Sequence, residues 1–111
     1  MKQGEIWQIN LDPSIGSEMK KMRPCIILNN DMIGRLALKV IAPITDFKEH
    51  YRDVPWMLTI EPNSKNGLKK ISTIDLFQVR SLSQKRLIKK IGFVDRDILS
   101  ACKESLDVVF G

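Results

Sequence analysis

The chain has 111 residues, a formal net charge of +5 at pH 7 and a pI near 9.4. This length predicts one domain, residues 1–111, that buries about two-thirds of its unfolded surface. No run of about eighteen apolar residues is present, so no membrane-spanning helix is predicted, and we expect no membrane partner. The first residues lack the apolar core of a signal peptide. The basic charge favours a polyanion or an acidic protein as partner.

The two cysteines, Cys25 and Cys102, lie in an apolar strand pattern and an apolar helix pattern. Free cysteine is among the most buried residue types, and two such residues do not make a disulfide framework. We therefore expect both to be small core residues in the reducing cytoplasm.

The first half of the chain predicts four strands. Residues 5–11 alternate, with Trp7, Ile9 and Leu11 on one face, and so predict a half-buried strand. Residues 12–22 form a connection of the length that binding loops have. Further strands are expected over residues 23–28, 36–44 and 54–60, because each is an apolar run bounded by turn-forming or charged residues.

The second half predicts one or two more strands and then helices. Residues 70–75 and 77–81 are typical of strands, with a bend near Asp75, and the turn-forming pair Asn66-Gly67 precedes them. Ser83 and Gly92 are placed to cap and end a short helix over residues 84–91. Asp95 is placed to cap a final helix from residue 96 to about 109 that carries an apolar stripe. The fold class is therefore mainly β with terminal helices, as a small antiparallel barrel or half-open sandwich.

One stretch, residues 16–24, brings charged side chains to the start of an apolar strand. Pro24 fixes its own φ and favours an extended backbone at Arg23, so the guanidinium is held by a rigid element. Glu18 precedes it by five residues, with Lys20 and Lys21 between them. A solvated turn leading into a core strand explains these residues equally well.

The residues exclude several kinds of chemistry. No Cys/His cluster has zinc spacing, no glycine-rich phosphate loop is present, and the chain has one histidine. Arginine, carboxylate and hydroxyl groups remain, and they suit phosphate chemistry in which the substrate supplies the nucleophile, as the ribose 2′-hydroxyl of RNA does. A guanidinium can bind two phosphoryl oxygens in a fork. Thr45, which follows the apolar run ending at Pro43-Ile44, can donate another hydrogen bond.

The sequence resembles the MazF/PemK family of toxin endoribonucleases over nearly its whole length. The matching blocks are Gly4-Glu5-Ile6-Trp7, Leu11-Asp12-Pro13, Gly16-Ser17-Glu18, Arg23-Pro24, Ala42-Pro43-Ile44-Thr45, Ser72-Thr73-Ile74-Asp75, Gln78-Val79-Arg80-Ser81 and Arg86-Leu87. The resemblance implies a PemK/CcdB-type, SH3-like antiparallel barrel with a C-terminal helix that acts as a homodimer without a cofactor. It also implies an acidic, MazE-like antitoxin as partner.

The resemblance further implies sequence-specific, metal-independent cleavage of single-stranded RNA, including mRNA, with 2′,3′-cyclic phosphate and 5′-hydroxyl ends. By motif match Arg23 and Thr45 are the expected catalytic pair, Glu18 is a further catalytic residue, and Gln78 and Arg80 lie on a strand lining the RNA groove. The residues themselves add Lys20, Lys21 and again Arg80 as contacts to the RNA backbone. A guanidinium gives up its proton reluctantly and a carboxylate is a weak base, so the general acid and base stay unassigned.

Two alternatives remain on the sequence alone. A CcdB-like gyrase poison of the same fold would not need Glu18 and Arg23 beside a lysine-rich loop. A degenerate relative that only binds an antitoxin or nucleic acid stays open, because Met19 and Met22 depart from common family residues.

Overall fold

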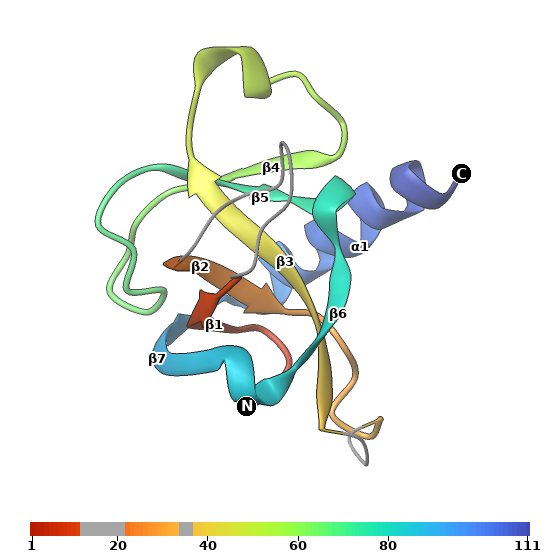
Figure 1. Ribbon diagram of the computed structural model, residues 1–111. Coiled ribbons are helices and arrows are strands. Elements are labelled where there is room, and N and C mark those ends of the chain that lie inside the picture. The colour runs from red at the N-terminus through yellow and green to blue at the C-terminus, as the bar shows by residue number, and fades with distance from the viewer. Residues whose placement is uncertain (12–21, 34–36) are drawn as a thin grey trace.

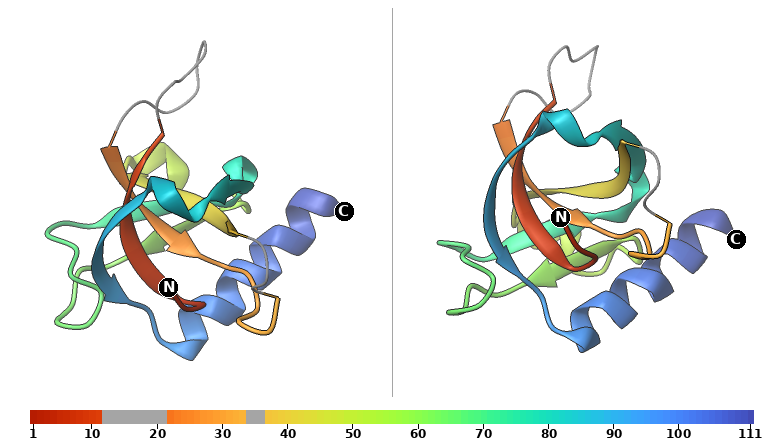
Figure 2. Two further views of the ribbon diagram at one scale, coloured as in Figure 1. Left: turned by 60° about the horizontal axis from the view of Figure 1, so that its bottom comes forward. Right: turned by 90° about the horizontal axis from the view of Figure 1, so that it is seen from below.

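The computed structural model describes residues 1–11, 22–33 and 37–111. In this part of the chain, seven antiparallel strands form a strongly curled sheet, and one long helix lies along its outside (Figures 1 and 2). The strands are β1 Glu5–Asn10, β2 Met22–Ile27, β3 Leu38–Asp46, β4 Met57–Ile60, β5 Ser72–Asp75, β6 Arg80–Ser83 and β7 Leu87–Phe93. The helix is α1 Arg96–Phe110, and three 3₁₀ turns are η1 Glu49–Tyr51, η2 Leu76–Gln78 and η3 Gln84–Arg86.

Strand β3 is the centre of the sheet, whose order is β4-β5-β3-β2-β1-β7 with β6 also paired to β3. One edge of β3 pairs with β2, while the other pairs first with β6 and then with β5. A nine-residue strand that pairs with two different strands along one edge must bend between them, and this bend curls the sheet into a barrel. The expected antiparallel barrel is confirmed.

The central strands are buried on both faces. One core cluster lies between the sheet and α1 and includes Ile6, Ile26, Ala42, Ile74 and Cys102. A second cluster lies on the opposite side and includes Ile9, Cys25, Ile27, Ile41 and Leu87. Successive residues of β2 therefore enter different clusters, which explains its unbroken apolar run.

The expectation of a half-buried first strand is wrong at one position. Trp7, Ile9 and Leu11 share a cluster as expected, but Ile6 on the other face is also fully buried. The reason is that α1 covers that side of the sheet. Both cysteines are buried in the core, as expected, and burial raises the pKa of each thiol to about 12.

The expected helix over residues 84–91 is also wrong. Ser83 does cap a turn, since its Oγ accepts a hydrogen bond from the Lys85 amide at 3.2 Å. However, the turn ends after one 3₁₀ step, and Leu87–Phe93 continues as β7, paired with β1. A free strand edge on β1 outweighed a weak local preference for helix. Among the described residues α1 is thus the one terminal helix.

The final helix agrees with its prediction. Asp95 is the N-cap, and its side chain accepts a hydrogen bond from the Ile98 amide at 3.1 Å. The apolar stripe faces the sheet: Cys102 is buried, and Ile98, Leu106 and Val109 pack against the same cluster. No helix in the described ranges is long and apolar enough to span a membrane.

The turn that follows β4 is fixed onto β7. The buried Asn66 side chain donates to the Glu61 carbonyl at 2.8 Å and accepts from the Leu68 amide at 3.0 Å. The Phe93 amide donates to the Lys65 carbonyl at 3.0 Å, which joins this turn to β7. Two distant segments, residues 63–68 and residues 87–93, are therefore held side by side.

Candidate active site

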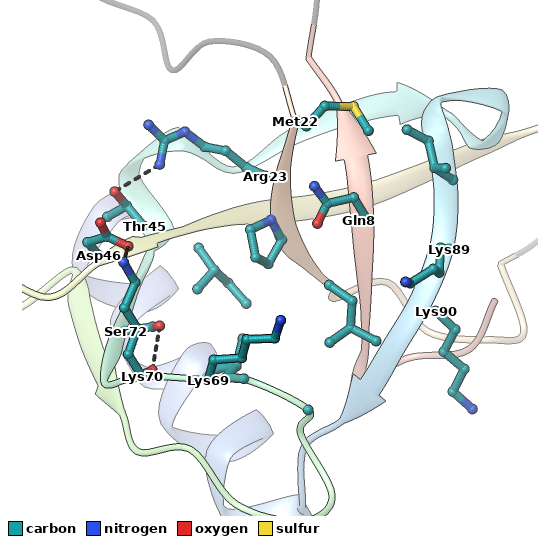
Figure 3. Close-up of a pocket in the computed structure, with 16 residues that line it drawn as sticks. Gln8, Met22, Arg23, Thr45, Asp46, Lys69, Lys70, Ser72, Lys89 and Lys90 are labelled. Carbon is teal, nitrogen blue, oxygen red and sulfur yellow. Dashed lines mark hydrogen bonds and ion pairs between the residues drawn. The ribbon is translucent and has the colours of Figure 1, made fainter.

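A cavity of about 830 Å³ opens between two walls of the barrel (Figure 3). The ends of β2 and β3 form one wall and contribute Arg23, Thr45 and Asp46. Strand β7 and the segment after the Asn66-Gly67 turn form the other wall and contribute several lysines. The floor is apolar and includes Ile44 and Ile91. The cavity is thus large enough for a few nucleotides or a peptide segment.

Arg23 and Thr45 meet on the first wall. Cys25 pairs with Pro43 in the β2–β3 ladder, and continuing this register by two residues sets Arg23 opposite Thr45. The Arg23 Nη1 atom donates a hydrogen bond to Thr45 Oγ1 at 3.1 Å (Figure 3). Strand β3 runs on to Asp46 and does not end at residue 44 as expected, so Thr45 is held inside a strand.

The guanidinium of Arg23 keeps unused donors. Its Nε atom is buried and has no hydrogen-bond partner within the described residues. The side chain as a whole is half-buried and lines the cavity. Arg23 is therefore fixed by the strand and by Thr45, and its charged guanidinium borders the cavity that an oxyanion would enter.

The cavity is strongly basic. Of its described lining residues five are cationic, namely Arg23, Lys69, Lys70, Lys89 and Lys90, and one is acidic, Asp46. The Lys70 Nζ atom lies 3.1 Å from Asp46 Oδ1, in an exposed ion pair. This charge excess favours an anionic ligand over a neutral or cationic one. No three Cys, His, Asp or Glu side chains of the described segments gather as metal ligands would.

Residues 2–110 match the model of the family described as PemK-like, MazF-like toxin of type II toxin-antitoxin system. The chain belongs to the PemK/MazF toxin family. It is 33% identical to Endoribonuclease MazF of Staphylococcus epidermidis, with 100% of this chain and 92% of that one covered. It is 30% identical to Endoribonuclease MazF9 of Mycobacterium tuberculosis, with 96% of this chain and 92% of that one covered.

The fold of this PemK/MazF protein also matches solved structures. An endoribonuclease from a mycobacterial species, solved in complex with its cognate antitoxin, superimposes with a TM-score of 0.78 at 16% identity. The match covers 100% of this chain and 95% of that one. The barrel with its C-terminal helix is therefore that of the family.

The structure places the sequence-predicted residues of this PemK/MazF protein in three groups. Arg23 and Thr45 meet at the cavity wall. Gln78 lies in η2, where its Nε2 donates to Asp75 Oδ2 at 2.8 Å, and Arg80 lies in β6 opposite Ile41; these two do not line this cavity. The remaining three, Glu18, Lys20 and Lys21, lie outside the described residues.

Sequence reasoning missed the residues of the second wall. Lys69 and Lys89 line the cavity. In the sequence each belongs to a basic pair, Lys69-Lys70 or Lys89-Lys90, and nothing local distinguishes these pairs from the other basic pairs of the chain. Period-two alternation could have separated Lys89 from Lys90, since neighbours on a strand face opposite ways. The helix caps at Ser83 and Gly92 hide this alternation, because they favour a helix over residues 84–91.

The Gly4-Glu5-Ile6-Trp7 block has a structural role in this PemK/MazF protein. The Glu5 Oε1 atom accepts hydrogen bonds from the Lys2 amide at 2.9 Å and from Trp7 Nε1 at 3.0 Å. The Oε2 atom lies 3.0 Å from Lys90 Nζ. Burial alone raises the pKa of Glu5, but these hydrogen bonds and the N-terminal charge outweigh it and lower the pKa to about 2.

This lowered pKa makes part of the protein's stability pH-dependent. Glu5 ionises near pH 4.5 when unfolded and near pH 2 when folded, so its contribution is complete above about pH 4.5 and is lost as the pH falls toward 2. At pH 7 we expect Glu5→Gln to lower the free energy of unfolding by about 1–2 kcal/mol, because solvent screens the half-exposed Lys90 partner. Denaturant titrations at pH 7 and pH 3 test this, and the difference from wild type should shrink at pH 3.

Glu49→Gln is the matched control for this prediction. Glu49 also pairs with a cation, at 2.9 Å from Arg52, but its side chain is 79% exposed. Its loss should leave stability nearly unchanged, because solvent screens an exposed ion pair. Equal effects of the two substitutions at pH 7 would contradict the role given to Glu5.

A buried hydroxyl beside the site leads to a second stability prediction. Thr73 is fully buried and pairs with Thr45 across β3 and β5, yet its Oγ1 has no hydrogen-bond partner in the described residues. A buried unpaired hydroxyl is unfavourable. We expect Thr73→Val to raise the free energy of unfolding by about 1 kcal/mol in thermal or urea denaturation. A loss of stability would mean that the hydroxyl is paired in solution.

Proposed function

We propose that this chain is a toxin endoribonuclease that cuts single-stranded RNA, including mRNA, at specific sequences without a metal ion. The supporting observation is the Arg23–Thr45 contact of 3.1 Å on the wall of a basic cavity. Relatives named endoribonucleases, one of them 33% identical over the whole chain, support the reaction class.

The proposed reaction uses the substrate's own nucleophile. The ribose 2′-oxygen attacks the adjacent phosphorus and loses its proton, while the bond from phosphorus to the 5′-oxygen breaks and that oxygen gains a proton. The products are a 2′,3′-cyclic phosphate and a 5′-hydroxyl. Negative charge builds on the phosphoryl oxygens during this step, and a fixed donor aimed at them lowers the barrier.

Arg23 and Thr45 suit this step in different ways. The guanidinium brings a permanent charge and the donors that Thr45 leaves free, so Arg23 stabilises the transition state. The Thr45 hydroxyl accepts from Arg23 and can donate its own hydrogen to a phosphoryl oxygen, which positions the phosphate. Glu18 remains the proposed base or orienting residue.

The proposed partners are single-stranded RNA and an acidic, MazE-like antitoxin. Single-stranded RNA suits in-line attack, because its backbone can turn and its bases are open to reading. An acidic antitoxin segment suits a cavity with five cations and one carboxylate. A homodimer in the cytoplasm is proposed from the family alone, and Gln78, Arg80, Lys20 and Lys21 remain proposed RNA contacts.

The test is cleavage of a long mixed-sequence RNA in excess chelator. We expect a few discrete cuts, each with a 5′-hydroxyl that polynucleotide kinase labels directly and a 3′ end that resists periodate until the cyclic phosphate is removed. Uncut RNA in the presence of folded protein would overturn the proposal. In that case, inhibition of gyrase supercoiling would identify a CcdB-like poison, and salt-sensitive RNA binding without scission would identify a degenerate relative.

A further inference from the structure

Four lysines line the second wall of the cavity. Two of them have an acidic partner and two do not. Lys70 is neutralised by Asp46, and Lys90 is neutralised by Glu5. Lys69 and Lys89 have no ion-pair or hydrogen-bond partner among the described residues. The unpaired charge on this wall is therefore concentrated at two positions.

The side chains of these two lysines converge. Figure 3 shows the amino groups of Lys69 and Lys89 both directed into the cavity, while that of Lys90 points away from it. Lys89 and Lys90 are neighbours in β7, and adjacent strand residues face opposite ways. Lys89 is thus the lysine of this strand that can reach a ligand in the cavity.

The backbone holds the two lysines in this arrangement. Lys69 follows a turn that the hydrogen bonds of the Asn66 side chain hold closed. The hydrogen bond from the Phe93 amide to the Lys65 carbonyl joins this turn to β7. A Cβ atom added at Gly92 would lie 2.4 Å from the Lys65 carbonyl oxygen, so the turn and β7 are in direct backbone contact. Two like charges that face one cavity repel each other, and an anion bound between them relieves that repulsion.

We propose that Lys69 and Lys89 form a second phosphate-binding site, which holds a non-scissile phosphate of the RNA strand cut at Arg23 and Thr45. This inference rests on the proposed ribonuclease function. The two walls of one cavity then have separate tasks. The Arg23 wall acts on the reacting phosphate, and the lysine wall fixes the position of the strand through a neighbouring phosphate.

Three expected results distinguish a phosphate-binding site from a catalytic site and from a site that recognises bases. Because the lysines touch no reacting atom, their loss raises KM and leaves kcat unchanged. Because a phosphate carries no sequence information, the cut sites stay the same. Because each contact releases bound counterions, each lysine lost lowers the slope of log KM against log salt by about 0.7.

The experiment compares Lys69→Gln, Lys89→Gln and the double variant with Lys103→Gln, which removes the same charge from an exposed position on α1. On an RNA oligonucleotide with one cut site, we expect each single variant to raise KM by about three- to tenfold and Lys103→Gln to change it less than twofold. Lys69→Arg and Lys89→Arg should have KM values close to that of wild type, because the positive charge is kept.

A phosphate scan then identifies the bound phosphate. A neutral methylphosphonate is placed at each non-scissile position of the oligonucleotide in turn. One position should raise KM for wild type and have no further effect in the double variant. The inference would be overturned if the methylphosphonate and lysine substitutions had additive effects at every position, or if the lysine variants had a lower kcat with unchanged KM. It would also be overturned if these variants bound an acidic peptide more weakly but RNA as tightly as wild type. If wild type does not cut RNA, the proposed function fails first, so the two failures are distinguishable.

Discussion

Arg23→Ala should reduce the rate of RNA cleavage at saturating substrate by about 10²–10³-fold, the cost of losing one preorganised donor to a developing oxyanion. Arg23 has the geometry for this role, because β2 and Thr45 fix its guanidinium at the cavity wall. Single-turnover cleavage of an oligonucleotide with one cut site measures the effect. RNA binding should remain measurable, because the lysine wall is intact.

Two companion variants separate the charge of Arg23 from its shape. Arg23→Lys keeps the positive charge but cannot form a fork to two oxygens, so most of the loss should remain. Arg96→Ala removes an exposed arginine at the start of α1 and should leave the rate unchanged. If Arg23→Ala cleaves at the wild-type rate while folded, the catalytic assignment is wrong.

The largest loss of stability is expected from adding one methyl group where the Asn66-Gly67 turn meets β7. The new Cβ of Gly92→Ala would lie 2.4–2.6 Å from backbone atoms of Lys65 and Asn66, and that of Gly67→Ala would lie 2.3 Å from the Ile91 carbonyl oxygen. Backbone cannot move aside as a side chain can. We therefore expect each variant to lose about 3 kcal/mol or more of unfolding free energy in urea denaturation.

Gly111→Ala is the matched control for Gly67→Ala. The two glycines have nearly the same positive φ, +67° and +68°, but a Cβ at Gly111 has no atom within 4 Å. Its substitution should cost less than about 0.5 kcal/mol, since a terminal residue can relax. Comparable losses at the two positions would show that backbone strain, and not the contact with β7, decides the effect.

These glycine variants also bear on the lysine wall. If Gly92→Ala folds, its turn must shift away from β7, and Lys69 shifts with it. Its KM should then rise by about as much as that of Lys69→Gln, while Arg23 and Thr45 on the other wall keep their contact. A stable Gly92→Ala protein with wild-type KM would contradict the link between this turn and the second phosphate site.

The sequence by itself determined the strand-rich barrel, the capped final helix and the cavity wall that carries Arg23 and Thr45. Apolar alternation in residues 5–11 and bounded apolar runs further on indicate the strands, and Pro24 before an apolar run holds Arg23 extended. These features are local, so they can be read from neighbouring residues.

Only the tertiary structure decided the other wall. Ser83 and Gly92 flank residues 84–91 as the caps of a helix would, but Leu87–Phe93 pairs with the open edge of β1 as a strand. This pairing turns Lys89 into the cavity and Lys90 toward Glu5, and the Asn66 turn brings Lys69 to the wall of the same cavity. Contacts between residues more than twenty positions apart made this choice, and no local pattern encodes them.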